Sequence, residues 1–253
     1  YRGAAIPQLY GWYVFGDYVR GHIWATHYDG TPGLKTFQRL TGDWTISTFG
    51  VDPRDGEILF ANLSEGRIRK LIYVPPEQAA PFPRTLADTG AFEELTNLTP
   101  HTGLVAYDVS VNFWSDHAHK RRWFSIPNGQ AQLGFQPEGN WDFPKGTVWV
   151  KHFDLEITNG VAASRRKLET RFLVRGSDET YGVTYIWDAA QTNAVLASPE
   201  GVDEIIDIYN PDGSLLRTQA WRYPSQLECG ICHNHSAGYA LGFSTAQLNR
   251  DHD

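Results

Sequence analysis

The sequence contains no methionine, only two cysteines and no long apolar run. No stretch approaches the roughly 18 consecutive apolar residues of a membrane-spanning helix, so no membrane span is predicted. Lys and Arg total 22 against 29 Asp and Glu, which gives a formal net charge of −7. Because the basic residues are dispersed, no surface for nucleic acid is expected.

The residues that are abundant favour a β-rich chain. Aromatic residues make up 13% of the sequence, with nine Trp, and there are 24 Gly and 14 Pro. Aromatic residues favour strands, whereas Gly and Pro favour turns. A chain of 253 residues is long enough for one large core or two smaller ones. It opens on Tyr1-Arg2-Gly3 without an initiator Met, from which we expect a processed or partial sequence.

Residues 1–73 form the first predicted segment, a series of hairpins. Short apolar runs at 12–15, 22–26, 46–51, 57–62 and 67–73 alternate with turn sequences such as Asp52-Pro53-Arg54-Asp55-Gly56. Four or five such strands amount to about one propeller blade. We therefore expect a partial propeller-like segment here.

Residues 74–98 form a predicted linker that ends in a short helix. Four prolines fall within residues 74–86, and such a segment continues neither a sheet nor a helix. A brief amphipathic helix is expected over 91–98, ended by Thr99-Pro100.

Residues 99–222 are predicted to form an antiparallel sandwich or open barrel. In the run 147–153, Val148, Val150 and His152 alternate with Trp149, Lys151 and Phe153. In the run 168–175, Leu168, Thr170, Phe172 and Val174 are expected on one face, with Glu169, Arg171 and Arg175 towards solvent.

Residues 223–253 contain the most informative motif, Cys229-Gly230-Ile231-Cys232-His233. C-x-x-C-H is the spacing of c-type haem attachment, because two thiols on one helical turn each reach a vinyl group of the porphyrin. The imidazole of His233 then reaches the iron from the proximal side. We expect haem c to be bound covalently through Cys229 and Cys232 in a short helical appendage.

Local patterns predict the helices of this appendage. Ser225 followed by Glu228 has the form of a capping box before the cysteine motif. Ser244 followed by Gln247 repeats the pattern before a second short helix over 245–249.

Two other uses of the cysteines remain open. A redox disulfide of the thioredoxin type normally follows a strand in a βαβ unit, and no such unit is visible. A metal such as zinc has four ligand types available in Cys229, Cys232, His233 and His235. These four are crowded into seven residues, although structural zinc sites usually draw ligand pairs from separate segments.

The sixth iron ligand is the next question. Without Met, a His/Met iron is excluded within this chain, so the iron is bis-His, has another ligand, or is open. His152 is the first distal candidate because it shares an apolar strand face, although a core histidine satisfied by hydrogen bonds is the commoner outcome. His119 is the second distal candidate.

The segment around His119 carries two weaker hypotheses. His117 and His119 lie on one face if the segment is extended, and Asp116 adds a carboxylate, as in a non-haem metal centre. Arg121 and Arg122 are candidates to pair with haem propionates.

The N-terminal part, residues 1 to about 75, resembles the closing region of the quinoprotein glucose and sorbosone dehydrogenase family. The resemblance lies in Phe15-Gly16-Asp17-Tyr18 and Gly21-His22-Ile23-Trp24. It implies a six-bladed propeller that carries pyrroloquinoline quinone. Most of that propeller is absent from the sequence, so the resemblance implies this cofactor only in a complete propeller.

Residues 98–249 resemble a family of predicted secreted c-type cytochromes that are often fused to such propellers. The shared motifs are Phe113-Trp114-Ser115-Asp116, His119-Lys120-Arg121-Arg122-Trp123, Leu168-Glu169-Thr170-Arg171, Cys229 with Cys232-His233, and Gln247-Leu248-Asn249. The resemblance implies haem held by Cys229 and Cys232, with His233 as its proximal ligand.

Together these observations predict an extracytoplasmic electron-transfer protein. Haem c is attached outside the bacterial cytoplasm, so a periplasmic or extracellular location follows if the motif is used. The expected partner is a redox protein or a fused quinoprotein domain that supplies electrons to the haem. A non-haem metal-binding or structural β module, and catalysis at a five-coordinate haem, are the alternatives.

Overall fold

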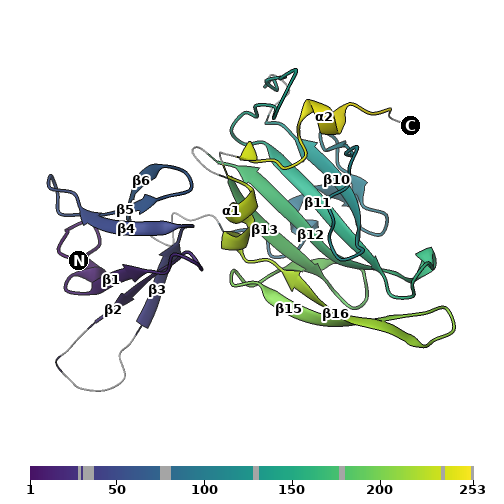
Figure 1. Ribbon diagram of the computed structural model, residues 1–253, viewed down its shortest axis with the longest axis horizontal. Helices are drawn as coiled ribbons and strands as arrows, with labels where there is room; N and C mark the ends of the chain where they lie inside the picture. Colours follow the sequence, from purple (N-terminus) through teal and green to yellow (C-terminus); the bar gives the residue numbers. More distant parts are fainter. Residues whose placement is uncertain are drawn as a thin grey trace. The chain divides into compact units, whose positions relative to one another are not determined.

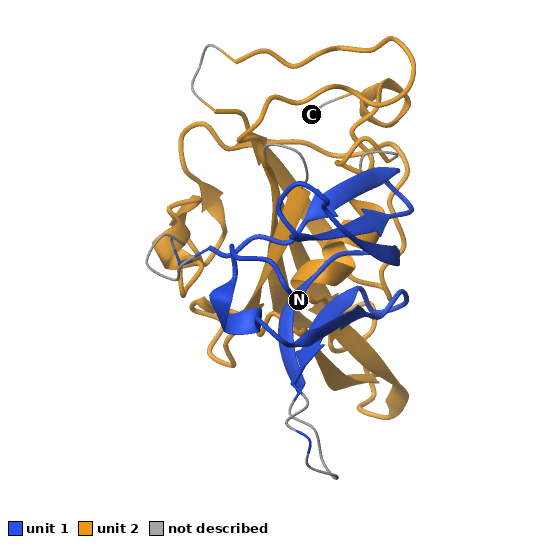
Figure 2. Ribbon diagram, turned by 90° about the vertical axis from the view of Figure 1, so that its left-hand side faces the viewer, with its two compact units in different colours: residues 1–81 blue, residues 82–253 orange. Residues whose placement is uncertain are grey.

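The computed structural model describes residues 1–27, 30, 37–74, 81–127, 131–176, 180–234 and 237–251. It is mainly β, with 43% strand and 9% helix, and its sheets are antiparallel, as predicted. The chain divides into two compact units, Tyr1–Pro81 and Phe82–Asp253 (Figure 2).

The first unit contains two three-stranded antiparallel sheets. One has the order β1 (Tyr13–Gly16), β2 (His22–Thr26), β3 (Phe37–Gly42), and the other β4 (Ile46–Val51), β5 (Ile58–Asn62), β6 (Arg67–Lys70). The prediction of a single blade of four or five strands is therefore wrong, and no propeller is formed by the described residues. Strand β3 was missed because it is a largely exposed edge strand without an apolar face.

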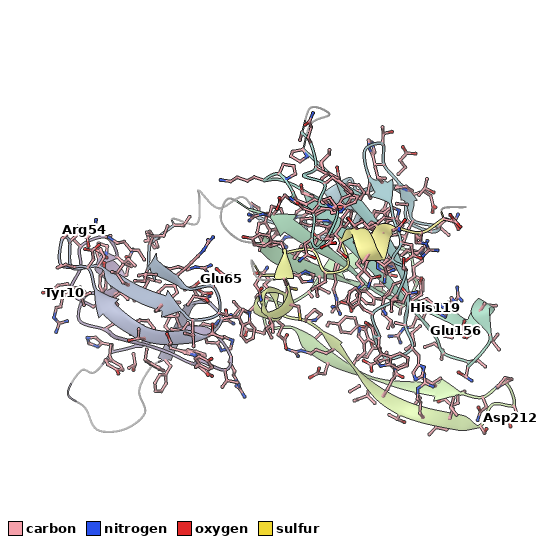
Figure 3. The ribbon with its side chains drawn as sticks, turned by 45° about the horizontal axis from the view of Figure 1, so that its top comes forward. Tyr10, Arg54, Glu65, His119, Glu156 and Asp212 are labelled. Carbon is pink, nitrogen blue, oxygen red and sulfur yellow. The ribbon has the colours of Figure 1, made fainter. Side chains whose placement is uncertain are left out.

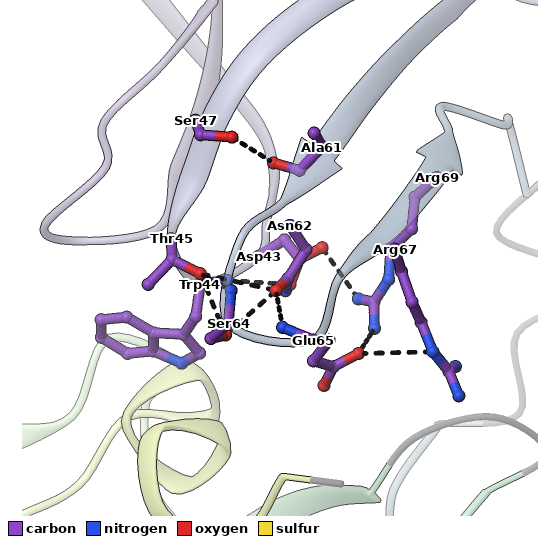
Figure 4. A network of polar contacts seen from close by, with 10 residues as sticks. All are labelled: Asp43, Trp44, Thr45, Ser47, Ala61, Asn62, Ser64, Glu65, Arg67 and Arg69. Atoms are coloured by element: carbon purple, nitrogen blue, oxygen red, sulfur yellow. Dashed lines mark hydrogen bonds and ion pairs between the residues drawn. The ribbon is translucent and has the colours of Figure 1, made fainter. Parts of the chain in front are cut away.

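A buried carboxylate organises the polar end of this unit (Figure 4). Asp43 accepts hydrogen bonds from Asn62 Nδ2 at 2.8 Å and from Arg69 Nη1 at 2.8 Å. Arg69 also contacts Glu65 at 2.6 Å. The backbone at Gly21 has φ +68°, and a Cβ there would lie 2.5 Å from the Asp43 carbonyl oxygen, so only glycine fits. The apolar core of the unit includes Ile6, Leu9, Ile23, Ala25, Ile46, Ile58, Phe60 and Leu71.

The second unit is built on a six-stranded antiparallel sheet of order β14-β13-β12-β11-β10-β9 (Figure 1). Its strands are β9 (Val105–Ala106), β10 (His119–Ser125), β11 (Val148–Glu156), β12 (Arg165–Arg175), β13 (Thr180–Trp187) and β14 (Ala194–Leu196). Two hairpins accompany it, β7 (Phe92–Glu94) with β8 (Thr99–Pro100) and β15 (Val202–Tyr209) with β16 (Leu215–Tyr223). Its described strands do not close into a barrel.

Both faces of this sheet are covered. One face, which we call the hairpin face because the β7–β8 hairpin packs on it, presents Val150, Phe172, Tyr185 and Trp187. These side chains pack against apolar residues of segment 86–104. The opposite face, which we call the helix face, presents Trp149, Lys151, Phe153 and Leu173. It is covered at one end by Ile206, Ile208, Trp221 and Tyr223 of β15 and β16, and at the other by Ala240 and Phe243 of the C-terminal segment. A central stretch of the helix face lies between these two coverings.

The predicted exposure of Glu169 is wrong, because β16 covers this part of the helix face. Glu169 was expected in solvent, but it is fully buried. Its carboxylate accepts hydrogen bonds from Trp221 Nε1 at 3.0 Å and from Arg171 Nε at 2.8 Å. The alternation along β12 was correct for Thr170 and Phe172, but it did not reveal that β16 lies over the other side.

A β-bulge overturns the expected position of Leu168. Phe153 pairs with Glu169 and Asp154 pairs with Lys167, so Leu168 is the extra residue between two pairs. It packs with Phe153 on the helix face rather than with Phe172 on the hairpin face.

The predicted helix over 91–98 is also wrong, because this segment is the β7–β8 hairpin. The carboxylate of Glu94 accepts hydrogen bonds from the backbone N–H groups of Thr96 and Asn97, which fixes a turn. Leu98 adopts φ +56° and is 2% exposed. Phe92 and Leu98 thus reach the core of the sheet from a hairpin, and the apolar spacing mimicked a helix. Of the expected linker, residues 75–80 lie outside the described residues.

Among the described residues there are also short 3-10 turns at Pro7–Leu9, Ala87–Thr89 and Ala162–Ser164 and two α-helices. Helix α1 (Gln226–Cys232) lies against β13, and α2 (Thr245–Leu248) follows near the C-terminus (Figure 1). Within the described part of the chain, no helix has both the length and the apolar character needed to cross a bilayer.

Candidate cofactor site

The cysteine motif lies on α1, whose start is fixed by the predicted capping box. Ser225 Oγ accepts a hydrogen bond from the backbone N–H of Glu228 at 3.1 Å, and Glu228 Oε2 accepts one from the N–H of Ser225 at 2.6 Å. Arg222 Nη2 contacts the same carboxylate at 3.0 Å. For α2, Ser244 is the N-cap as predicted, but its side chain makes no capping hydrogen bond. The capping box is therefore complete at α1, whereas the side-chain hydrogen bond of the cap is absent at α2.

Helix α1 approaches the helix face closely at Gly182 of β13. A Cβ at this position would lie 2.5 Å from Cys229 Sγ and 2.7 Å from Cys229 Cβ. Such distances are far inside van der Waals contact, so glycine is required for this approach. Both cysteines are free thiols, Cys229 half-buried and Cys232 exposed.

His233, the last residue of the motif, has a defined tautomer. Its Nδ1 lies 2.7 Å from the carbonyl oxygen of Tyr239. A carbonyl only accepts hydrogen bonds, so Nδ1 carries the proton and Nε2 of the neutral ring keeps its lone pair. Burial lowers the pKa of His233, so the neutral ring is favoured. Tyr239 is held in turn, with φ +64° and its N–H donated to the Asn234 carbonyl at 3.0 Å.

A cavity of about 310 Å³ lies between α1 and the helix face. This volume is at the lower end of the range for sites of organic ligands and cofactors. Apolar and aromatic side chains dominate the walls, and the polar groups include the motif, three cations of the sheet, Glu228 and Ser115. The lining includes Cys229, Cys232, His233, Arg122, Lys151, Arg171, Tyr107, Phe113, Trp114, Trp149 and Leu173.

Lys151 is the unusual group in this cavity. Burial, together with the nearby charges of Arg122 and Arg171, lowers the pKa of Lys151 to about 7. Arg122 differs, because its guanidinium is 2.8 Å from Asp108 Oδ1 and 2.9 Å from Asn112 Oδ1.

The electrostatics of Cys229 argue against a redox dithiol. Burial raises the pKa of its thiol to about 11. Reactive cysteines of C-x-x-C oxidoreductases have a lowered pKa instead, because the thiolate is the reactive form.

For the zinc hypothesis, no group of three or more His, Cys, Asp or Glu side chains suited to a metal ion is found among the residues that the structure describes. His235, the fourth ligand of the zinc hypothesis, lies outside those residues.

The structure does not bring His152 to the motif. Its neighbour Lys151 lines the cavity, and successive residues of a strand point to opposite faces. His152 is fully buried on the hairpin face, and both ring nitrogens have partners, Thr170 Oγ1 at 2.8 Å and Asp154 Oδ1 at 2.9 Å. It is a core histidine satisfied by hydrogen bonds, the commoner of the two outcomes considered for it, and it does not line the cavity.

His119 is also outside the cavity. Its side chain is 45% exposed, and Nε2 lies 3.3 Å from Glu156 Oε1 (Figure 3). It lines a separate, open groove of about 1240 Å³. Asp116 and His117 adopt φ +43° and +67°, so this segment is a turn, and the extended arrangement of the metal hypothesis is not formed.

The two candidate partners of the propionates, Arg121 and Arg122, lie on opposite faces of the sheet. Arg122 lines the cavity. Arg121 donates to the Asn97 carbonyl at 2.8 Å and lies on the side of His119 and Asp154. Alternation along β10 is the reason, because consecutive residues point to opposite faces.

Sequence reasoning did not identify Lys151, Arg171 or Tyr239 as site residues. The alternation along 147–153 did place Lys151 between Trp149 and Phe153, and a lysine flanked by aromatic residues on a covered face was an available clue. No pattern indicated that α1 lies over this face, because that contact depends on Gly182, far away in the sequence.

The donor set fits a covalent haem: two thiols, an imidazole with a free lone pair and strand cations surround one largely apolar cavity. Comparison with known proteins adds no relative, since no family model, no curated protein and no solved structure matches the chain.

Proposed function

We propose that this chain is a c-type haem protein in which Cys229 and Cys232 form thioethers and His233 Nε2 is the proximal ligand. The observation that carries the proposal is the hydrogen bond from His233 Nδ1 to the Tyr239 carbonyl. Metal-ligating histidines characteristically donate their second ring nitrogen in this way, which fixes the tautomer and the ring orientation. A neutral imidazole beside two thiols on one cavity wall is what a covalent haem requires.

Electron transfer is the function that we propose for this haem. A bound haem supplies one-electron chemistry, and the chain's own residues hold it, bury it and set the charge around it. Cys232 is exposed, so a haem attached there would be accessible to a redox partner or a fused quinoprotein domain. Pyrroloquinoline quinone belongs to the proposal only as the cofactor of a complete propeller. The proposed location is periplasmic or extracellular.

The distal side distinguishes two versions of the proposal. Neither His152 nor His119 lines the cavity, and among its described lining residues His233 is the one histidine. Ligand binding or catalysis at a five-coordinate haem is therefore the second candidate function. Addition of cyanide to the oxidised protein, or carbon monoxide to the reduced protein, tests this version. A rapid change of the absorption spectrum supports an open site, and an unchanged spectrum supports electron transfer alone.

The proposal is tested by expression in a host that has the haem c attachment machinery. We expect a Soret band that stays with the polypeptide after denaturation and acid-acetone extraction, because the bonds are covalent. The variant Cys229→Ala/Cys232→Ala should lose this retention, whereas His119→Ala should keep it as a matched control. A colourless protein, or one with stoichiometric zinc and no iron, would reject the haem assignment.

A further inference from the structure

The amino group of Lys151 has no counter-charge in the cavity that would stabilise its protonated form. Its ammonium lies 5.1 Å from the ring centre of Phe153 and 5.9 Å from that of Phe113. Its Nζ makes no hydrogen bond or ion pair with any part of the chain that the structure describes. Aromatic faces attract a cation, but more weakly than a carboxylate at hydrogen-bond distance does. An ammonium group withdrawn from water needs a stronger partner than this.

The neighbouring cations do not lack partners. Arg122 is paired with Asp108, and Arg171 donates to Glu169 through Nε and Nη2. The Nη1 group of Arg171 has no hydrogen-bond partner among the described residues. Two donors, Lys151 Nζ and Arg171 Nη1, are therefore available beside the cavity.

The carboxylates nearby are already used. Glu228 lines the cavity, but its side chain caps α1 and contacts Arg222 at 3.0 Å. Glu169 is held by Arg171 and Trp221. The cavity therefore has no free carboxylate to stabilise the protonated form of Lys151, in an environment that penalises an unpaired charge. A negative group on the molecule that fills the cavity would remove this penalty.

We infer that Lys151, assisted by Arg171 Nη1, is a receptor for a carboxylate of the cavity's occupant. This inference rests on the proposed function, under which the carboxylate is a propionate of the covalent haem. Cys229, Cys232 and His233 would hold the porphyrin from α1, and Lys151 and Arg171 would then bind a propionate from the sheet. Lys151 is thus a positioning residue that also sets the charge felt by the iron.

The assignment predicts a change of reduction potential. Loss of the Lys151 charge leaves a propionate uncompensated, which favours the oxidised iron, whose charge is more positive. We expect Lys151→Gln to shift the ratio of reduced to oxidised protein about tenfold towards oxidised at a given potential, or about 59 mV for one electron. Lys151→Arg should restore most of the wild-type potential. Lys145→Gln, on an exposed loop, is the control and should leave the potential unchanged.

The potentials are measured by spectroelectrochemical titration of the full chain, after the intact mass has shown the haem in place. A haem-loaded Lys151→Gln chain whose ratio differs less than twofold from wild type would overturn the inference. Sodium acetate, compared with sodium chloride at equal ionic strength, separates the two sources of carboxylate. An acetate-insensitive wild-type potential supports the propionate, whereas an acetate-dependent one would assign the site to an external carboxylate and overturn the propionate assignment.

A second arm does not depend on the haem. In the Cys229→Ala/Cys232→Ala chain, acetate should raise the Tm more than chloride does, and Lys151→Gln should remove this difference. If no haem attaches to the wild-type chain, the proposed function fails, but this arm still decides whether Lys151 binds a carboxylate. Equal acetate effects with and without Lys151 would overturn the receptor itself.

Discussion

At the scale of single residues, the second unit depends on a few polar groups that are buried with defined partners. Glu169 has no exposed surface and accepts hydrogen bonds from Arg171 and Trp221. A buried ion pair with both partners present contributes little to the free energy of unfolding. Removal of one partner is strongly destabilising, because the other keeps its charge without compensation.

Glu169→Gln tests this point. The amide keeps the shape of the side chain but leaves the guanidinium of Arg171 without its carboxylate. We expect the free energy of unfolding to fall by about 3 kcal/mol, measured by urea denaturation. The control is Glu138→Gln on an exposed loop, which should change stability by less than about 0.5 kcal/mol. A loss below about 1 kcal/mol for Glu169→Gln would show that the ion pair is not needed.

His152 makes a prediction about pH. Burial lowers its pKa below the ordinary 6.5, although Asp154 opposes the shift. Above pH 6.5 the ring is neutral in both folded and unfolded chains, so the stabilisation is complete there. As the pH falls below 6.5, the unfolded chain takes up the proton first, and stability is lost. The free energy of unfolding should therefore decline from pH 7.5 to pH 5.5, and less steeply in His152→Gln. Equal slopes would contradict this origin.

At the scale of elements, α1 is held to the sheet by one close contact. Gly182→Ala would place a methyl group against Cys229 Sγ, where the space is 2.5 Å. We expect a loss of about 1–3 kcal/mol by overpacking, together with a lower yield of covalent haem. The matched control is Gly50→Ala in β4, where a Cβ meets nothing within 4 Å. Thermal unfolding and Soret absorbance measure the two effects, and a Gly182→Ala chain equal to wild type in both would refute the contact.

The elements also show what the sequence predicted and where it failed. Helix α1 was predicted because its start depends on Ser225 and Glu228, three residues apart. The helix predicted over 91–98 is a hairpin instead, because Phe92 and Leu98 reach the core through a turn fixed by Glu94. Edge strand β3 has no apolar face to detect. Features that depend on residues close together in the sequence, such as the start of α1, were therefore predictable. Features that depend on contacts with residues distant in the sequence were not.

The candidate site also combines residues predicted from local sequence patterns with residues placed there by contacts between distant segments. Cys229, Cys232 and His233 were predicted from local spacing, and the structure adds a hydrogen bond from His233 Nδ1 to the Tyr239 carbonyl. The distal candidates could not be judged from the sequence, because the covering of the helix face by α1 determines which strand residues reach the motif. Alternation along β11 then separates His152 from Lys151.

At the scale of the whole molecule, the two compact units allow separate unfolding transitions. In the first unit, Asp52 contacts Arg54 at 2.7 Å and Lys70 at 2.9 Å. These partners hold the pKa of Asp52 well below its ordinary value of 3.8. Its stabilisation is complete above about pH 4 and is lost as the pH falls further. Acid titration followed by circular dichroism should show this loss, reduced in Asp52→Asn. An unchanged acid midpoint in that variant would contradict the assignment.

The most direct test of the central claim is the intact mass of the denatured full chain after expression with haem c attachment machinery. The account predicts a polypeptide heavier by one haem, with neither Cys229 nor Cys232 available to a thiol reagent. A mass equal to the polypeptide alone, with both thiols reactive, would contradict it.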